Sequence, residues 1–262
     1  MIVDFHTHMF PERIAESTIR FLSDVCGIHA YTSGTYEGLS ASTKEAGIDL
    51  SVALPVVTKP SQFATIAQFA REHQEGNILS FAGVHPADPN AESALVSLSK
   101  IGIKGIKLHP DYQDTYFNDI RYKRILARAS ELGMITVVHA GVDAKCPDHV
   151  HCTPKMAEEV INEVQPSNLV LAHMGGNRLW DEVEEYLVGR DVYLDTGVVL
   201  DRMPQEQFLR IVKNHGAGRI LFATDSPWAG QKEYVAIMRG MPLAEAEKEK
   251  ILGGNAQKLL QL

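Results

Sequence analysis

The stretch "NDIRYKRILARASELGMITVVH" (residues 118–139) joins a helical pattern directly to a strand pattern. Over residues 118–133, apolar side chains recur at intervals near 3.6 residues, which predicts an amphipathic helix. The run that follows, "MITVVH" (134–139), is short, apolar and rich in β-branched residues, as expected of a strand that is buried on both faces. A strand that follows a helix in this way is a unit of a parallel sheet.

The same alternation extends to both ends of the chain. Helical segments such as "PKMAEEVINEV" (154–164), for which Thr153 is the expected N-cap, separate further strand-like runs. These runs are "IVDFH" (2–6), "DLSVALPV" (49–56), "ILSFAGVH" (78–85), "IKGIKLH" (103–109), "NLVLAH" (168–173), "DVYLDTG" (191–197) and "RILFATD" (219–225).

Eight strand–helix units in 262 residues predict an α/β fold, a single (β/α)8 TIM barrel that forms one domain over residues 1–262. A doubly wound open sheet is the alternative. It is disfavoured because "HTHMFPE" follows the first strand, where a dinucleotide-binding sheet carries a glycine-rich turn.

Charge and composition narrow the range of partners. The formal net charge is −8 and no basic stripe is present, which argues against nucleic acid or an anionic membrane as a partner. No run approaches the ~18 apolar residues of a membrane span, and polar residues from Asp4 onward leave no room for a signal peptide. Three cysteines, an odd number, favour reduced thiols. We therefore expect a cytoplasmic protein that acts on a small-molecule substrate, as a monomer or as a homo-oligomer.

Histidines gather at the carboxyl ends of the predicted strands. Six of the eleven lie there, namely His6, His8, His85, His109, His139 and His173, and Asp225 ends the last strand. Active sites of TIM barrels are built at this end of the strands. Imidazoles together with one carboxylate are a typical ligand set for Zn²⁺ or a similar divalent ion.

This ordered set, with its flanking motifs, resembles the amidohydrolase superfamily. The motifs "GIKLHP" (105–110), "AHMGG" (172–176), "LFATDSPW" (221–228) and "ILGGNAQKLL" (251–260) are similar to those of the amidohydrolase-related group. That group contains metal-dependent hydrolases and decarboxylases of the aminocarboxymuconate-semialdehyde and γ-resorcylate types. The resemblance covers essentially the whole chain and implies the TIM-barrel fold.

The resemblance also implies roles for particular residues. His6, His8, His139 and Asp225 would bind the metal, while His173 would stand beside it and activate water or polarise the substrate. Asp225 would also act as general base and then as general acid. We expect one ion, with Zn²⁺ favoured. Two ions would be expected if Lys107 were carboxylated, as a lysine of the fourth strand is in some members of the superfamily.

Other side chains are candidates for substrate contacts: Lys107, His109, His85, His151 and Trp228. Each also has a structural interpretation, such as an ion pair for the lysine or packing for the tryptophan. His151 belongs to the long segment 140–154, which is a candidate lid or substrate-reading loop. Asp4, which shares a strand face with His6 and His8, is expected either to orient one of them or to form a buried ion pair.

We expect a metal-dependent hydrolase that cleaves a small-molecule amide, ester or lactone-like bond, because metal-bound water can supply hydroxide near neutral pH. The alternative is a metal-dependent non-oxidative decarboxylase, which needs a cationic side chain such as Lys107, Arg178 or Arg202 to bind a carboxylate of the substrate. A metal-binding protein without catalysis is a third interpretation, and it would not explain why Asp225 and His173 accompany the ligands.

Overall fold

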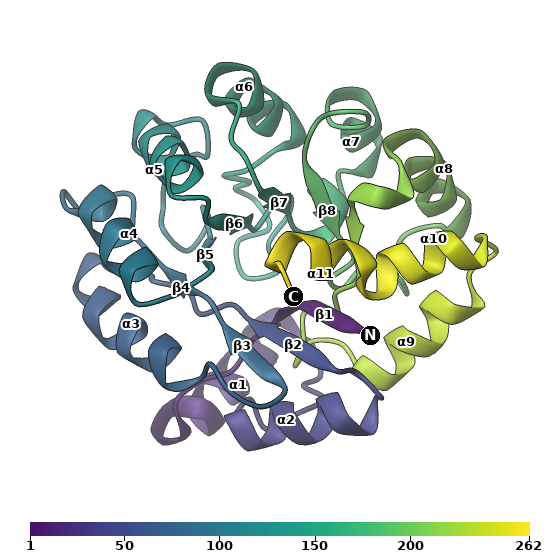
Figure 1. The fold of residues 1–262 in the computed structure, drawn as a ribbon, viewed down its shortest axis with the longest axis horizontal. Helices are drawn as coiled ribbons and strands as arrows, with labels where there is room; N and C mark the ends of the chain where they lie inside the picture. The colour runs from purple at the N-terminus through teal and green to yellow at the C-terminus, as the bar shows by residue number, and fades with distance from the viewer. The chain divides into compact units, whose positions relative to one another are not determined.

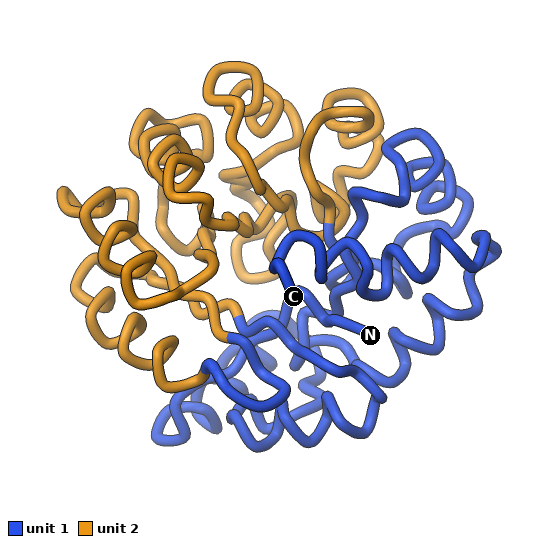
Figure 2. Tube along the Cα trace, in the orientation of Figure 1, with its two compact units in different colours: residues 1–53, 74–79, 195–262 blue, residues 54–73, 80–194 orange.

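Strands and helices alternate along the whole chain in a computed structural model that describes residues 1–262 (Figure 1). The chain divides into two compact units, coloured separately in Figure 2. Unit 1 comprises residues 1–53, 74–79 and 195–262, and unit 2 comprises residues 54–73 and 80–194. The single domain over residues 1–262 stays a prediction.

Unit 1 contains a parallel sheet built around the first strand. Strand β1 (Val3–Thr7) pairs with β2 (Leu50–Ala53). On the other side of β2, Ser51 N donates to Asn77 O at 2.9 Å, just before β3 (Ile78–Ser80). The segment that continues β9 (Ile220–Leu221) lies along the opposite edge of β1, since Phe5 N donates to Phe222 O at 2.9 Å.

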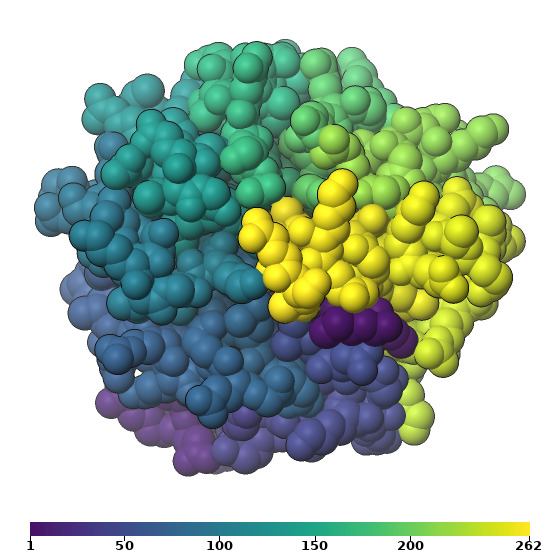
Figure 3. Space-filling model, viewed as in Figure 1, coloured from purple at the N-terminus to yellow at the C-terminus, as the bar shows by residue number.

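Six helices and two short helical turns belong to unit 1. They are α1 (Glu12–Cys26), α2 (Tyr36–Glu45), α8 (Gln205–His215), η3 (Ala217–Arg219), α9 (Gln231–Gly240), α10 (Glu245–Glu249), η4 (Lys250–Gly254) and α11 (Asn255–Leu260). The last of these helices lie beside the amino-terminal residues, and the two ends of the chain are neighbours on the surface shown in Figure 3. Phe222 N donates to Ile251 O at 2.9 Å, which ties the carboxyl-terminal helices to the sheet.

Unit 2 contains five consecutive parallel strands. They are β4 (Ala82–Gly83), β5 (Gly105–Leu108), β6 (Ile135–Val138), β7 (Leu169–Leu171) and β8 (Tyr193–Asp195), whose last residue belongs to unit 1. In register they place Gly83, Lys107, Val137, Val170 and Tyr193 in one row across the sheet. The residues that follow the strands therefore share one edge.

Two helical elements of unit 2 precede its first strand, and the others follow its strands in order. They are η1 (Pro60–Gln62), α3 (Phe63–Glu72), α4 (Ala91–Lys100), α5 (Ile120–Glu131), α6 (Pro154–Val164), η2 (His173–Gly175) and α7 (Trp180–Tyr186). The N-cap expected for α6 is confirmed, because the Thr153 hydroxyl accepts a hydrogen bond from Met156 N at 3.2 Å. Helix α5 begins after Asp119, whose carboxylate accepts from Arg121 N.

All eight predicted strands are present, and most are shorter than their apolar runs. The third run, residues 78–85, forms two pieces, β3 and β4, separated by Phe81. None of the helices combines the length and the hydrophobicity that crossing a lipid bilayer requires.

Candidate metal centre

Three side chains of unit 1 converge on one point. His6 Nε2 lies 3.2 Å from His8 Nε2 and 3.2 Å from Asp225 Oδ1, and His8 Nε2 lies 3.0 Å from the same carboxylate oxygen. His6 is buried, while His8 and Asp225 keep side-chain exposures of 15% and 12%. Two imidazole nitrogens and one carboxylate oxygen thus face each other at an accessible site.

The backbone explains why these three side chains meet. Side chains alternate along a strand, so His6 and His8 leave β1 on the same face while Phe5 is buried on the other. Asp225 N donates to His6 O at 2.7 Å, which holds the segment after β9 against β1. Asp225 itself adopts a left-handed conformation with φ 65°. Backbone strain of this kind concentrates at functional sites.

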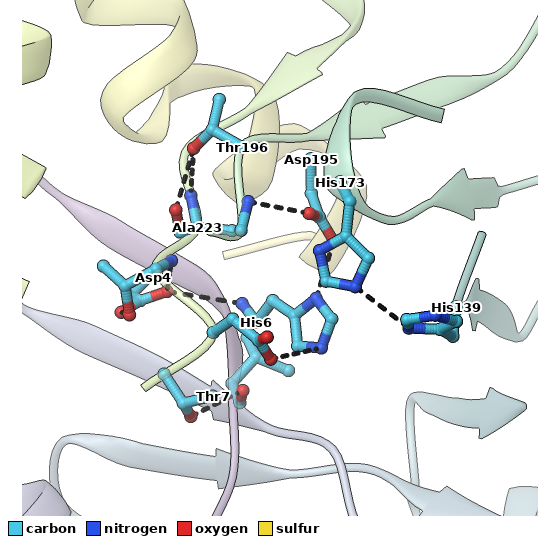
Figure 4. Close-up of polar contacts among 12 residues, drawn as sticks. Asp4, His6, Thr7, His139, His173, Asp195, Thr196 and Ala223 are labelled. Atoms are coloured by element: carbon cyan, nitrogen blue, oxygen red, sulfur yellow. Dashed lines mark hydrogen bonds and ion pairs between the residues drawn. The ribbon is translucent and has the colours of Figure 1, made fainter. Parts of the chain in front are cut away.

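A buried carboxylate holds the imidazole of His6 from its other side (Figure 4). Asp195 Oδ2 lies 2.9 Å from His6 Nδ1, and Asp195 is 0% exposed. The other oxygen of Asp195 accepts a hydrogen bond from Gly197 N at 2.9 Å. Each ring nitrogen of His6 therefore has its own partner, and Nε2 is the one that faces His8 and Asp225.

The role of Asp4 differs from the two that were expected, which were to orient a histidine or to form a buried ion pair. Its carboxylate accepts hydrogen bonds from the Thr224 backbone and hydroxyl at 2.9 and 2.6 Å and from Gln231 Nε2 at 2.8 Å. Burial raises the pKa of Asp4 to about 7, against the opposing effect of these hydrogen bonds. Asp4 thus fastens β1 to the segment that carries Asp225, and the orienting carboxylate for His6 is Asp195.

The three converging atoms fit a divalent cation. Ligand atoms bound to Zn²⁺ at about 2.0–2.2 Å lie roughly 3.3–3.6 Å apart in a tetrahedral arrangement and roughly 2.8–3.1 Å apart at right angles. The observed separations of 3.0–3.2 Å lie at the boundary of these two ranges. Nitrogen and carboxylate ligands suit both zinc and manganese. His6, His8 and Asp225 therefore form a candidate metal site.

A second group of histidines lies at the strand ends of unit 2. His109 follows β5, His139 follows β6 and His173 follows β7. His173 Nε2 lies 3.0 Å from His139 Nδ1, so these two imidazoles share a hydrogen bond (Figure 4). The ring of His109 stacks between those of Tyr112 and His139, with centroid distances of 3.8 and 4.1 Å. This stack fixes the plane of the His139 ring.

Two carboxylates face the same imidazoles. Asp143 Oδ2 lies 3.7 Å from His109 Nε2 and 3.9 Å from His139 Nε2, and Asp111 Oδ2 lies 3.8 Å from His139 Nε2. Asp111 Oδ2 is buried and accepts no hydrogen bond. Burial raises the pKa of Asp111, and its hydrogen bonds from His151 oppose that rise. His109, His139 and Asp143 form a further group with the spacing of cation ligands.

The candidates for substrate contact in unit 2 have distinct environments. Lys107 is completely buried within β5. His151 Nδ1 lies 3.1 Å from Asp111 Oδ1, and its ring stacks on Tyr116. His85 accepts a hydrogen bond from Ala87 N at 3.1 Å, and burial lowers the pKa of His85.

Three further candidates can be placed. Trp228, in unit 1, is half-buried, and its backbone N donates to Asp225 O at 2.9 Å in the turn after β9. Arg178 is exposed, and Arg202 Nε lies 3.8 Å from Asp201 Oδ1. Their roles toward a substrate stay predictions. The chain contains no disulfide.

Asp195, Asp111 and Asp143 were missed by the sequence analysis. For Asp195 a signal was present, because it follows the apolar residues of "DVYLDTG" as Asp225 follows those of "RILFATD". Asp111 and Asp143 lie in loops, where no periodicity shows which way a side chain points.

The comparison with protein families decides where the chain belongs. The family model described as amidohydrolase matches residues 3–262, nearly the whole chain. The chain belongs to the amidohydrolase family. The resemblance drawn from the strand-end motifs is thereby confirmed. No curated protein matches this amidohydrolase in sequence.

Solved structures share its fold at low sequence identity. An uncharacterized TIM-barrel protein from Bordetella bronchiseptica is 19% identical with a TM-score of 0.78, covering 99% of this chain and 98% of that one. The 5-carboxyvanillate decarboxylase of Sphingomonas paucimobilis is 15% identical with a TM-score of 0.73, covering 100% and 99%. A dihydroxybenzoic acid decarboxylase from Polaromonas sp. JS666, with bound manganese and the inhibitor 2-nitroresorcinol, is 15% identical with a TM-score of 0.72, covering 100% and 97%.

These neighbours confirm the predicted fold and correct the predicted reaction. The amidohydrolase has the α/β fold of TIM-barrel proteins, with parallel strands and helices alternating along its length. The hydrolysis of an amide, ester or lactone was the wrong expectation, because the neighbours with named reactions are decarboxylases. The physical reason is that one metal-ligand set can serve either reaction, so the ligands alone do not distinguish them. The preference for zinc is likewise not supported by the neighbour that holds manganese.

Proposed function

We propose that this amidohydrolase is a metal-dependent, non-oxidative decarboxylase of a small carboxylate. The observation that carries the proposal is the convergence of His6 Nε2, His8 Nε2 and Asp225 Oδ1, each within 3.2 Å of the other two. Support for carbon–carbon cleavage comes from the decarboxylases among the structural neighbours, one of which holds manganese. In TIM-barrel proteins, strand ends of this kind carry the active site.

His6, His8 and Asp225 would hold one divalent cation, Mn²⁺ or Zn²⁺, at the end of β1. Such a cation supplies a Lewis acid that stabilises the negative charge left on the substrate when CO₂ departs. Asp195 and Asp225 together place two carboxylates around His6, which favours binding of a cation there. The roles of His139 as a further ligand, and of a carboxylated Lys107 as a bridge to a second ion, stay predictions.

Decarboxylation replaces the departing CO₂ by a proton on the same carbon, so a proton carrier is required. We assign this role to Asp225 and His173. Asp225 Oδ1 lies 3.0 Å from His8 Nε2, and His173 Nε2 lies 3.0 Å from His139 Nδ1. The imidazole of His139 lies within hydrogen-bond reach of His173 and can return its proton after the reaction, while Asp225, whose side chain is 12% exposed, would regain its proton from solvent.

The substrate class is a small molecule bearing a carboxylate, with aromatic acids favoured by the neighbours' substrates. Lys107 and His109 are the proposed contacts for its carboxylate, because they are two residues apart on one face of β5 and its extension. His85, His151 and Trp228 are proposed as further substrate contacts. Replacement of Lys107 by methionine is expected to raise KM for the substrate while leaving metal content unchanged.

The experiment is a screen for CO₂ release by the purified chain after loading with Mn²⁺ or Zn²⁺. The panel contains 5-carboxyvanillate, dihydroxybenzoic acids and other aromatic carboxylates, together with esters and lactones. We expect CO₂ release from at least one acid, its loss in His6→Ala, and its retention in the exposed-histidine control His29→Ala. Turnover of an ester or lactone without CO₂ release from any acid would overturn the proposal.

A further inference from the structure

We propose that Asp195 is a positioning residue that keeps the proton of His6 on Nδ1 and thereby presents Nε2 to a metal ion. The second half of this inference rests on the metal site of the proposed function. The first half concerns the imidazole itself, and it can be measured without any metal or substrate.

Asp195 is built rigidly into unit 1. Its side chain is 0% exposed, and its two oxygens are occupied separately, Oδ2 by His6 Nδ1 at 2.9 Å and Oδ1 by Gly197 N at 2.9 Å. The next residue, Thr196, is fastened to the neighbouring strand segment, since its hydroxyl donates to Ala223 O and accepts from Ala223 N, both at 2.8 Å (Figure 4). The carboxylate therefore cannot follow the ring if His6 rotates.

The proton on His6 follows from this geometry. A neutral imidazole carries one N–H, and an ionised carboxylate can only accept hydrogen bonds. An ionised Asp195 accepts at both oxygens, from Gly197 N at Oδ1 and from His6 Nδ1 at Oδ2, so His6 Nδ1 is the donor in the second bond. The lone pair of His6 is then on Nε2, the atom 3.2 Å from both His8 Nε2 and Asp225 Oδ1.

The opposite tautomer makes a different and testable arrangement. It would require a protonated Asp195 as the donor to Nδ1, with His6 Nε2–H donating to Asp225 Oδ1. Such an imidazole could not bind a cation through Nε2 without first losing that proton. Asp4 cannot fix the tautomer of His6 in place of Asp195, because its carboxylate accepts hydrogen bonds from Thr224, from Gln231 and from the backbone N of His6.

The first measurement is the ¹⁵N spectrum of the histidine rings in the full chain after chelation of bound metal. The signals of His6, one of eleven histidines, are identified by their absence from the His6→Gln variant. We expect a protonated Nδ1 and an unprotonated Nε2. A neutral ring with its proton on Nε2 overturns the inference.

The second measurement titrates Mn²⁺ or Zn²⁺ into Asp195→Asn, with Asp191→Asn as the control from the exposed start of the same strand region. Because Gly197 N needs an acceptor, the asparagine oxygen is expected to face it and the amide NH₂ to face His6 Nδ1. The proton would then move to Nε2, and metal affinity should fall by about 10–100-fold, as for other partners of ligating histidines. The control should keep the wild-type affinity.

The outcomes separate this inference from the proposed reaction. Wild-type affinity and an unchanged His6 tautomer in a folded Asp195→Asn variant would overturn the inference, with folding checked by circular dichroism. If Asp195→Asn does not fold, the ¹⁵N spectrum of the wild-type chain still decides the tautomer. If the wild type binds metal yet releases no CO₂ from any acid, the proposed reaction fails while the metal and tautomer results continue to decide the role of Asp195.

Discussion

At the scale of single residues, two candidate catalytic side chains sit on strained backbone. Asp225 has φ 65° and His173 has φ 60°, in the left-handed region that side-chain-bearing residues seldom adopt. Such a conformation costs on the order of 1–2 kcal/mol per residue. Asp and Asn tolerate it better than most residues, so a substitution of Asp225 by Asn tests the carboxylate without adding backbone strain.

We therefore predict that Asp225→Asn folds as the wild type does but binds Mn²⁺ or Zn²⁺ at least about tenfold more weakly, because one anionic ligand atom is lost. Equilibrium dialysis followed by metal analysis measures the affinity. Asp24→Asn, on the exposed surface of α1, is the matched control. Equal metal affinity in Asp225→Asn and wild type would remove Asp225 from the ligand set.

The limits of prediction from sequence are clear at this scale. His6, His8 and Asp225 could be predicted to meet, because their positions at strand ends are visible in apolar runs. Asp195 could not be paired with His6, since 189 residues separate them and only the packing of strands brings them to 2.9 Å. The stack of Tyr112, His109 and His139 depends on a loop conformation that no periodicity specifies.

At the scale of elements, helix α5 shows how one cap couples stability to pH. Asp119 accepts hydrogen bonds from the backbone and guanidinium of Arg121, and these bonds lower the pKa of Asp119 to about 2. The folded-state pKa is thus below the ordinary value of about 3.9. The stabilising effect of the carboxylate is present above about pH 4 and is lost as the pH falls toward 2.

Replacement of Asp119 by alanine is predicted to cost about 1 kcal/mol at pH 7, a typical value for an N-cap, and distinctly less at pH 3. Urea unfolding at the two pH values measures the difference. Asp119→Asn, which caps without a charge, should lose less stability and show a weaker pH dependence. A loss in Asp119→Ala that is the same at both pH values would contradict this account of the cap.

The loop after β6 is held by a close backbone approach at Gly141. Gly141 has φ 85°, and a Cβ added there would lie 2.1 Å from Asn177 N. Two backbone hydrogen bonds surround this glycine: Gly141 N donates to Cys152 O at 2.8 Å, and Asn177 N donates to Ala140 O at 2.9 Å. The loop that follows His139 and carries Asp143 therefore starts from a position that only glycine can occupy without a shift of the backbone.

Gly141→Ala is accordingly predicted to destabilise the chain by at least about 2 kcal/mol, since overpacking adds to the cost of the left-handed conformation. Gly133→Ala is the matched control, because Gly133 has φ 65° and no atom within 4 Å of an added Cβ. It should cost only about 1 kcal/mol. Thermal unfolding of the two variants measures the difference in stability. Equal midpoints would contradict the prediction, because they would show that the contact with Asn177 costs no additional stability.

At the scale of the whole molecule, the alternation of strands and helices was predictable over all 262 residues. Apolar runs and helical periods are local signals, and the family match over residues 3–262 agrees with them. The reaction was not predictable from the same signals. Hydrolysis and decarboxylation use similar metal ligands, so the ligand motifs alone do not distinguish the two reactions.

Metal binding is predicted to stabilise the entire fold. His6 and Asp225 come from the first strand and from the segment after the last one, so a cation that joins them binds the folded chain and not the unfolded one. At a metal concentration about 100 times Kd, the expected gain is ~2.7 kcal/mol, or an increase in Tm of several degrees. Differential scanning fluorimetry with Mn²⁺ or Zn²⁺ measures this, and an equal increase in His6→Ala would contradict the assignment of the site.

The most direct test of the central claim is the product balance of the metal-loaded chain on an aromatic carboxylate ¹³C-labelled in its carboxyl group. We predict one ¹³CO₂ for each substrate molecule consumed, with hydrogen in place of the carboxylate in the product, and no turnover by His6→Ala. Consumption of substrate without ¹³CO₂, with the label retained in a hydrolysis product, would contradict the account.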